Sequence, residues 1–364
     1  MFLIEPRPSL FIRPILPEKP MNTLEVKQLT KRFGNKEVLR GVSFCVKKGQ
    51  LLALLGPSGC GKTTTLRMIA GLEPPDAGEI WMEGVLASRG NKAMISQKQR
   101  HIGMVFQDLA LWPHITVYEN IEFGLKVAGL VRAERREKIE AVLKKVNMGR
   151  HAKEYPGKLS GGQQQLIAIA RAIVTEPKLL LMDEPLSNID VKLREDIRQE
   201  MKRIQQETQI TTVYVTHDQE DAFLLADQVV VMDAGRVEQV GSPEEIYSTP
   251  NSLFVANFVG ESNIIPVKIP GENKILTPWG EWACNTKGRE SGNATLLFRP
   301  HHATIVKCGC CNGIIINRGF VGDVYKYNIS SSGEKIKLHA YERYEVGQPV
   351  RFSIEKMEVM FIDN

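Results

Sequence analysis

The segment Gly56–Thr63, GPSGCGKT, constrains this chain more than any other stretch. It fits the pattern G-x-x-x-x-G-K-[ST], follows an apolar run at Leu51–Leu55, and precedes a helix-period stretch at Thr64–Ala70. Strand, glycine-rich loop and helix in that order form the context that a phosphate-binding loop requires. The glycines let backbone N–H groups surround phosphates, the helix N-terminus adds a positive end, and Lys62 reaches the β- and γ-phosphates. We therefore expect phosphate binding here, with the Thr63 hydroxyl offered to Mg²⁺; a plain glycine-rich turn is the alternative.

Length and composition indicate an ordinary globular protein. The chain has 364 residues, of which 43% are apolar and 24% charged, and at about 150 residues per domain it should hold two or three domains. The net charge of +5 is a mild excess, short of the basic stripe of a dedicated nucleic-acid binder. No run approaches the ~18 consecutive apolar residues of a membrane-spanning helix. Six cysteines lack the paired C-x-x-C spacing of zinc sites, so we expect reduced thiols.

The pattern of apolar residues changes near Gly260. Between Leu24 and Gly241, short β-branched or leucine-rich runs alternate with helix-period stretches such as Arg132–Met148, which is typical of an α/β layer with a mainly parallel sheet. After Gly260, short strand candidates separated by turn residues predict a small all-β module, a barrel. These candidates are Asn263–Ile269, Thr295–Phe298, Gly313–Ile316, Val324–Ser330, Lys335–His339 and Pro349–Ile354.

The predicted fold class is therefore an α/β domain followed by a small all-β barrel. We place the α/β domain at residues 23–260 and the barrel at 261–364. Five prolines fall within the first twenty residues, and proline disfavours the helical core of a signal peptide. Residues 1–22 are thus predicted to form an extended, poorly ordered leader, with Met21 as an alternative start.

Two carboxylates end a second buried-strand candidate, Leu179–Glu184. The carboxyl ends of parallel strands are where ligands bind in an open α/β sheet. Asp183 is a candidate to hold Mg²⁺ through water, and Glu184 is a candidate to polarise the water that attacks a γ-phosphate. A common strand exit before a proline is the alternative reading.

A second candidate anion site opens the helix-period run that follows Leu159. Ser160 and Gln163 form a capping-box pattern around Gly161 and Gly162, which predicts a helix N-terminus suited to an anion. One nucleotide needs only one phosphate loop. The second candidate anion site therefore binds another nucleotide or the other face of the same nucleotide.

With these motifs in this order, the chain resembles the nucleotide-binding subunit of an ABC transporter over about Leu24–Gly241. In that family the sequence LSGGQ, here Leu159–Gln163, contacts the γ-phosphate of ATP held by the opposite subunit of a head-to-tail dimer. The resemblance implies ATP hydrolysis at two composite sites, and a helical subdomain at about residues 108–165 within the P-loop domain.

The resemblance also gives roles to four further residues. Phe33 matches the aromatic residue that stacks on adenine, and Gln107 matches the glutamine that touches Mg²⁺ and the attacking water. Asp190 matches the loop that crosses the dimer interface, and His217 matches the switch histidine that hydrogen-bonds the γ-phosphate. For a lone histidine after a strand, a structural role is the alternative.

From about Glu261 the β module resembles the OB-like, TOBE-like C-terminal barrel of import-type ATPases for sugars, polyamines, iron, sulfate and similar solutes. Phe298–Pro300 and Gly347–Phe361 carry that likeness. The Cys308–Cys311 cluster matches no pattern of that family, and we interpret it as a thiol-containing turn, with metal or redox sensing as the alternative.

The candidate residues fall into three groups. The catalytic candidates are Glu184, His217 and Gln107, and the candidate Mg²⁺ ligands are Thr63, Gln107 and Asp183. The candidate ATP-binding residues are Phe33, Gly56, Pro57, Ser58, Gly59, Cys60, Gly61, Lys62, Thr63, Thr64, Ser160, Gly161, Gly162, Gln163 and Asp190.

The resemblance implies ATP and Mg²⁺ as cofactors and a homodimer or paired ATPase subunit as the functional unit. Its other implied partners are transmembrane permease subunits and an external solute-binding protein, with no nucleic acid, at the cytoplasmic face of the inner membrane. The first alternative is a soluble ABC ATPase that acts on nucleic acid or ribosomes through an OB-like module, and a kinase-like phosphotransferase is the second. A single cassette, with about a hundred residues between phosphate loop and LSGGQ, favours the transporter subunit.

Overall fold

The computed structural model describes residues 22–187, 189–286 and 291–360, which divide into two compact units. The first unit joins the described residues before Ala53 to Gly61–Val215, and the second joins Ala53–Cys60 to the described residues from Thr216 onward. Strand β3 (Leu51–Leu55) runs from the first unit into the second. The predicted leader lies outside the described residues, apart from Asn22.

An antiparallel sheet begins the first unit. Its order is β2-β1-β4-β5-β6, with β1 (Asn22–Phe33), β2 (Lys36–Lys47), β4 (Ala77–Met82), β5 (Val85–Arg89) and β6 (Lys92–Ala93). A two-residue turn joins β1 to β2, and Gly34 supplies the positive φ of 58° that such turns favour. This sheet adds antiparallel strands that the sequence pattern did not separate from the parallel layer.

Parallel strands form the part of the first unit that carries the motifs. β7 (Ile102–Val105) pairs with β8 (Leu179–Asp183), and β8 pairs with β9 (Thr211–Thr216), in parallel. Every residue of β8 and β9 is buried, as expected of parallel strands covered on both faces. The prediction of a parallel α/β layer is confirmed here.

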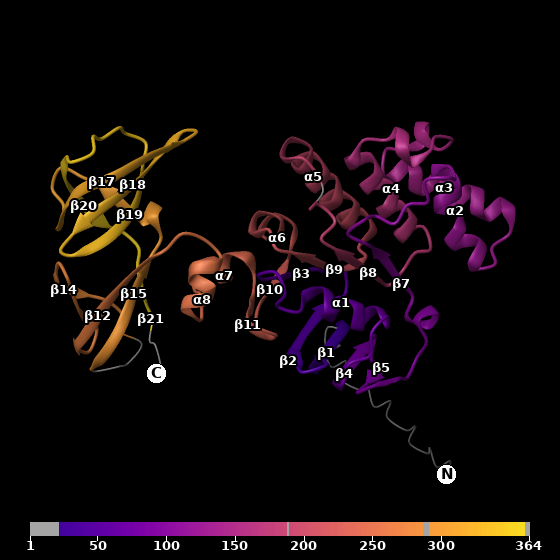
Figure 1. Ribbon diagram of the computed structural model, residues 1–364, viewed down its shortest axis with the longest axis horizontal. Helices are drawn as coiled ribbons and strands as arrows, with labels where there is room; N and C mark the ends of the chain where they lie inside the picture. The colour runs from indigo at the N-terminus through magenta and orange to yellow at the C-terminus, as the bar shows by residue number, and fades with distance from the viewer. Residues whose placement is uncertain (1–21, 188, 287–290, 361–364) are drawn as a thin grey trace, which may run out of the picture. The chain divides into compact units, whose positions relative to one another are not determined.

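Helices of the first unit begin at capped or glycine-rich positions. Thr116 and Ser160 both form capping boxes, at the start of α2 and α4. Helices α2, α3 and α4 pack against one another, and Figure 1 shows them gathered together. The α-helices are α1 (Lys62–Ala70), α2 (Val117–Val127), α3 (Arg132–Lys145), α4 (Gly161–Ile173) and α5 (Val191–Thr208). Short 3₁₀ turns lie at Gln97–Arg100, Gly149–His151 and Pro156–Lys158.

The second unit contains a hairpin and three short helices before its β-rich part. Strand β10 (Gln228–Asp233) pairs antiparallel with β11 (Arg236–Gly241). The helices are α6 (Gln219–Leu225), α7 (Pro243–Ser248) and α8 (Leu253–Phe258). Among the described residues of both units, no helix is long and apolar enough to cross a membrane.

Two five-stranded antiparallel sheets form the C-terminal part, visible as two layers in Figure 1. Their orders are β14-β13-β12-β15-β21 and β16-β20-β17-β18-β19. One apolar core lies between them, with Leu296 and Phe298 from the first sheet and Ile329 and Phe352 from the second. The strands are β12 (Asn263–Gly271), β13 (Lys274–Thr277), β14 (Gly280–Ala283), β15 (Gly292–Phe298), β16 (Ala303–Ile305), β17 (Cys311–Val321), β18 (Val324–Ser331), β19 (Glu334–Ala340), β20 (Pro349–Ile354) and β21 (Glu358–Met360).

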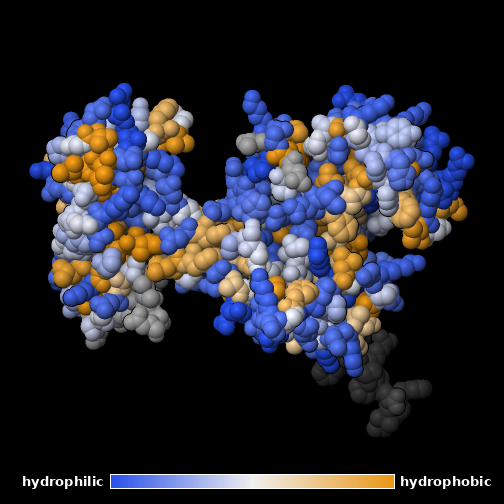
Figure 2. All heavy atoms as spheres, in the orientation of Figure 1, coloured by the Kyte–Doolittle hydropathy of each residue, from blue (hydrophilic) through white to orange (hydrophobic). Residues whose placement is uncertain are grey.

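This β-rich part confirms the predicted all-β module and is consistent with an OB-like barrel. Strand β17 is longer than the predicted Gly313–Ile316, because pairing with β18 continues to Val321↔Val324. The tip of this hairpin is apolar: Phe320 and Val321 are 63% and 57% exposed, and Figure 2 shows the tip as a hydrophobic projection. Cys45, Cys308, Cys310 and Cys311 are free thiols, and the sulfurs of Cys310 and Cys311 lie 3.6 Å apart.

A buried arginine ties the β-rich part to the helices before it. Arg299 is 2% exposed, and its Nη1 donates to the carbonyl of Ala256 at 2.8 Å and to Ser262 Oγ at 2.6 Å. Its Nη2 donates to the Tyr247 carbonyl at 2.8 Å, and the guanidinium lies 4.2 Å from the centre of the Tyr247 ring. Both terminal nitrogens of the buried guanidinium therefore have carbonyl or hydroxyl acceptors, and an aromatic face lies beside it.

Candidate functional site

The centre of the candidate site is a contact between the phosphate-loop helix and strand β8. Thr63 Oγ1 donates a hydrogen bond of 2.9 Å to Asp183 Oδ1. Thr63 stands in the first turn of α1, and Asp183 is the last residue of β8. The two motifs are 120 residues apart in sequence, so the fold brings together two of the predicted Mg²⁺ ligands. A hydroxyl and a carboxylate are the hard oxygen donors that Mg²⁺ prefers.

Asp183 occupies an electrostatically unfavourable position for a carboxylate. Its side chain is 6% exposed. Burial raises its pKa, the hydrogen bond from Thr63 opposes the rise, and the negative charge of Glu184 adds to it. A cation beside the ionised carboxylate would offset that cost, so the residues present fit a divalent metal ion.

Glu184 follows Asp183 in a strained backbone conformation. Its φ is 43°, in the left-handed region that residues other than glycine rarely adopt. Its N–H donates to the Val215 carbonyl at 3.0 Å, and its own carbonyl accepts the Ser187 hydroxyl at 2.9 Å. These contacts fix the backbone of the half-buried Glu184 at the end of β8, and non-glycine strain of this kind is concentrated at functional sites.

The phosphate loop itself needs several of its glycines. Gly59 and Gly61 have φ of 81° and 106°, and a Cβ on Gly61 would lie 2.3 Å from Leu39 Cδ2. In the second unit, a Cβ on Gly56 would lie 2.3 Å from the Met232 carbonyl oxygen. Cys60 N–H donates to the Pro57 carbonyl within the loop, at 3.3 Å. This tight backbone path is what the sequence pattern predicted for Gly56–Thr63.

The two helix N-termini predicted to bind phosphate are capped differently. Gly61 precedes α1 and provides no side-chain cap. Ser160 caps α4: its Oγ accepts the Gln163 N–H at 3.3 Å, and Gln163 Oε1 accepts the Ser160 N–H at 3.0 Å. The capping box that the sequence predicted at Ser160–Gln163 is therefore present. Lys62, the first residue of α1, is 4% exposed.

The two glycines after Ser160 have different surroundings. A Cβ on Gly162 would lie 2.8 Å from Leu193 Cδ2 and 2.9 Å from Ile197 Cδ1, so this glycine lets α4 pack closely on α5. Gly161 is exposed, and a Cβ there would meet no atom within 4 Å. Packing of α4 on α5 therefore explains why a glycine stands at position 162. Gly161 instead faces solvent.

Asp190 has a structural role in the chain itself. It is the N-cap of α5, and its Oδ1 accepts the Leu193 N–H at 3.1 Å. The same helix supplies Leu193 and Ile197, which contact the Gly162 position. The predicted interface loop and the Ser160–Gln163 segment are thus joined through α5. Asn188, in the same loop, lies outside the described residues.

Gln107 is exposed at the end of β7 and precedes a segment with unusual backbone. Leu109 and Ala110 have consecutive positive φ values of 60° and 48°. Arg171 of α4 holds both, donating to the Leu109 carbonyl at 2.7 Å and the Ala110 carbonyl at 2.6 Å. Sequence reasoning missed this role of Arg171 because no local pattern connects residues about sixty positions apart.

A second missed residue, Asn120, fixes the same segment. Its Oδ1 accepts the Trp112 N–H at 2.9 Å, and its Nδ2 donates to the Trp112 carbonyl at 3.1 Å. The Trp112 ring packs against Phe123 with a centroid separation of 4.7 Å and lies 5.5 Å from the Arg171 guanidinium. The segment after Gln107 is therefore held in place while Ala110 remains exposed.

The remaining two predicted residues lie at strand ends. His217, in the second unit, is exposed between β9 and α6. The next residue, Asp218, caps α6 and donates its N–H to Thr216 Oγ1 at 2.9 Å. Phe33, in the first unit, ends β1 and is 49% exposed. Its ring is thus available to a flat partner, as the stacking role requires.

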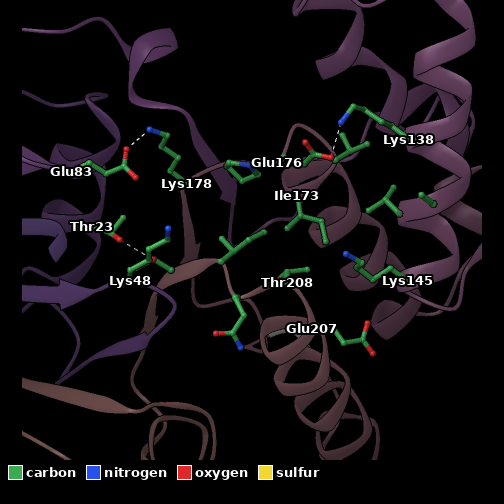
Figure 3. A pocket seen from close by; sticks show the side chains of 17 residues that line it. Thr23, Lys48, Glu83, Lys138, Lys145, Ile173, Glu176, Lys178, Glu207 and Thr208 are labelled. Carbon is green, nitrogen blue, oxygen red and sulfur yellow. Dashed lines mark hydrogen bonds and ion pairs between the residues drawn. The ribbon is translucent and has the colours of Figure 1, made fainter. Parts of the chain in front are cut away.

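A separate pocket of about 500 Å³ in the first unit is lined by none of the predicted site residues. Figure 3 shows two ion pairs on its walls, Lys178 with Glu83 and Lys138 with Glu176. The helices α3, α4 and α5 end beside it, and Lys145, in the last turn of α3, compensates the dipole of that helix. We assign this pocket no part in nucleotide chemistry.

Comparisons with known proteins show the family of this chain. A family model described as ABC transporter matches residues 39–187. The chain is 46% identical over 325 residues to an Fe(3+) ions import ATP-binding protein of Photorhabdus laumondii, covering 87% of this chain and 90% of the relative. It is 39% identical over 341 residues to a spermidine/putrescine import ATP-binding protein of Acetivibrio thermocellus, covering 92% and 95%.

A solved structure supports the same conclusion. CbiO1 from Clostridium perfringens, part of the ABC transporter complex CbiONQ, matches with a TM-score of 0.57 at 31% identity, over 62% of this chain and 90% of that chain. The chain therefore belongs to the ABC transporter family, as an import-type ATP-binding subunit that hydrolyses ATP.

Proposed function

We propose that this chain powers solute import by hydrolysing ATP between two copies arranged head to tail, in complex with a separate transmembrane permease. The observation that carries the proposal is the Thr63–Asp183 contact of 2.9 Å, which joins the phosphate loop to the end of β8 beside Glu184. The two curated relatives are named for different solutes, ferric ion and spermidine/putrescine. We therefore propose solute import and no particular solute.

In this proposal the residues of the phosphate loop bind the triphosphate. Backbone N–H groups of Gly56–Thr64 surround the β- and γ-phosphates, with Lys62 supplying a positive charge. Phe33 stacks on the adenine ring. Thr63 and Asp183 would hold Mg²⁺, with Gln107 as a further ligand, and a bound ion would supply neutralising charge to the phosphate oxygens.

Glu184 is the proposed general base. Its carboxylate accepts a hydrogen bond from the attacking water and takes its proton as the water adds to the γ-phosphorus, while the bond from that phosphorus to the β–γ bridging oxygen breaks and ADP leaves. His217 donates a hydrogen bond to a γ-phosphate oxygen. The strained backbone of Glu184, with φ of 43°, fixes the carboxylate before substrate binds, which lowers the cost of orientation.

The second copy is proposed to complete each site. Ser160, Gly161 and Gln163 of one subunit contact the γ-phosphate held by Lys62 of the other, and Asp190 lies at the interface. Gly161 supports this arrangement because it is exposed and no atom of the described residues lies within 4 Å of its Cβ position. The partners are then a second ATPase subunit, the permease and an external solute-binding protein, with the ATPase peripheral at the cytoplasmic face.

The Glu184→Gln variant tests the catalytic assignment. The amide keeps the shape of the side chain but cannot take the proton, so hydrolysis should fall by ~10²-fold or more while ATP binding is retained. Steady-state phosphate release and equilibrium ATP binding measure the two effects separately. Lys62→Ala is the contrasting variant, because it should weaken ATP binding itself. Near-parental hydrolysis by Glu184→Gln would remove Glu184 from the mechanism.

A further inference from the structure

A buried lysine lies beside the ring that we propose to stack on adenine. Lys31 and Phe33 are two positions apart on β1, so their side chains share a face of the strand. The Lys31 Nζ lies over the Phe33 ring, 5.3 Å from its centroid, within the range of a cation–π contact. The Lys31 side chain is 7% exposed, whereas Phe33 is 49% exposed.

The ammonium group of Lys31 is fixed by the loop that follows α1. It lies 2.6 Å from Glu73 Oε1 and 3.5 Å from Asp76 Oδ1, and it donates to the Pro74 carbonyl at 2.6 Å. The other oxygen of Asp76 accepts the Arg32 N–H at 2.7 Å. These contacts hold a long, flexible side chain in one orientation against β1.

The charge of Lys31 is retained in spite of burial. Burial alone would lower the pKa of Lys31, but the hydrogen bond and charge of Glu73, with a contribution from Asp76, outweigh it and raise the pKa. The same two carboxylates neutralise the ammonium at longer range. Direct attraction of a triphosphate is therefore a poor explanation for this lysine, and an effect on the adjacent ring is a better one.

We propose that Lys31 is a positioning residue for the nucleotide base: it holds the Phe33 ring in its stacking orientation and strengthens stacking on the ring's other face. This proposal rests on the proposed role of Phe33. A fixed cation attracts one face of the ring, which restrains a half-exposed side chain before the nucleotide arrives. Less conformational freedom is then lost on binding. The cation also withdraws π-electron density, which favours stacking of an electron-rich purine on the opposite face.

A double-mutant cycle on the full-length chain tests the proposal. Lys31→Met removes the charge and keeps the length of the side chain, so ATP should bind about two- to fivefold more weakly with kcat unchanged. In a Phe33→Ala background, the same substitution should change ATP affinity by less than about 1.5-fold, because its effect acts through the ring. Lys31→Arg should restore most of the affinity, since it keeps the cation.

Two controls separate this effect from a structural one. Arg32→Met removes an exposed neighbouring cation and should leave ATP affinity unchanged. Inorganic tripolyphosphate carries no base, so its inhibition constant should be the same for the parent and Lys31→Met. Equal weakening of tripolyphosphate and ATP by Lys31→Met would show a disturbed phosphate site and overturn the proposal.

The outcomes also separate this proposal from the one on which it rests. If Phe33→Ala leaves ATP affinity unchanged, the stacking role of Phe33 is wrong and the role of Lys31 falls with it. If Phe33→Ala weakens ATP binding but Lys31→Met has the same effect with and without the ring, only the role of Lys31 is wrong.

Discussion

Asp183 in the first unit and Arg299 in the second both carry buried charges, and the two groups differ in their hydrogen-bond partners. Arg299 is surrounded by oxygen acceptors of its own unit, among them Ala256, Ser262 and Tyr247. Among the described residues, the Asp183 carboxylate receives one hydrogen bond, from Thr63, and an ionised carboxylate accepts about four. Both terminal nitrogens of Arg299 bond oxygens of its own unit, which indicates a structural charge, whereas a buried carboxylate with most of its acceptor capacity unused indicates a ligand site.

The largest expected effect on stability comes from Arg299→Met. The substitution leaves buried carbonyl groups without a donor, and we expect it to reduce the free energy of unfolding of the second unit by about 3 kcal/mol or more. Chemical denaturation followed by tryptophan fluorescence measures this, since Trp279 and Trp282 pack against the β-rich core.

Lys326→Met is the matched control for Arg299. It removes an ion pair with Glu261 in which both side chains are more than 40% exposed, so the loss should stay below about 1 kcal/mol. Equal losses from the two variants would mean that Arg299 is not the anchor that its contacts indicate.

In contrast to Arg299→Met, Asp183→Asn is not expected to lower the free energy of unfolding. The pKa of Asp183 in the folded state lies above its ordinary value. Ionisation of this carboxyl therefore lowers the free energy of unfolding by the full amount at pH values above the folded pKa. At pH values below the unfolded pKa it has no effect. Near pH 7 the neutral amide should therefore leave stability unchanged or raise it by up to about 1 kcal/mol, while Mg²⁺-dependent hydrolysis is lost.

Thermal unfolding at two pH values tests the sign of this effect. The advantage of Asp183→Asn over the parent should shrink as the pH falls below the carboxylate range. Asp323→Asn, at an exposed hairpin position, is the control for replacing a surface carboxylate. A clear loss of stability in Asp183→Asn at neutral pH would place Asp183 with Arg299 as a structural charge.

The smallest effect on the isolated subunit is expected from Ala110→Glu. Ala110 is exposed, and only its carbonyl is used by Arg171, so the new side chain should leave soluble ATPase activity within about twofold. If the segment after Gln107 docks a permease helix, transport or assembly should be lost in the whole complex. Ala133→Glu, at an exposed position of α3, should affect neither. Joint loss of soluble ATPase activity and thermal stability in Ala110→Glu would show that the segment belongs to the core.

Local patterns predicted the elements that carry the motifs. The apolar run Leu51–Leu55 is β3, the predicted helical stretch Thr64–Ala70 lies within α1, and the Ser160 box opens α4. Each depends on neighbouring residues and on simple backbone rules. The strands at Val324–Ser331 and Pro349–Ile354 agree with the predicted ranges within one residue for the same reason.

The features that the sequence did not predict depend on contacts between residues far apart in the chain. Lys31 with Glu73, Arg171 with Ala110 and Arg299 with Ala256 each join segments about forty or sixty positions apart. Short strands such as β13 and β21 were missed because too few apolar residues alternate within them. They form because a neighbouring strand offers unpaired backbone groups.

We propose that each ATP site is built from residues of two copies of the chain. Mixing two inactive variants tests this arrangement. One chain carries Lys62→Ala and the other carries Gly161→Asp, chosen because Gly161 is exposed and has no neighbour at its Cβ position, whereas Gly162 packs on α5. In a head-to-tail dimer, a mixed pair has one site with both lesions and one site with neither. We predict that an equal mixture recovers about a quarter of parental hydrolysis, and that Lys62→Ala mixed with Lys62→Ala/Gly161→Asp recovers none. Failure of two folded, mixed chains to regain activity, or full activity from a strictly monomeric parent, would contradict the account.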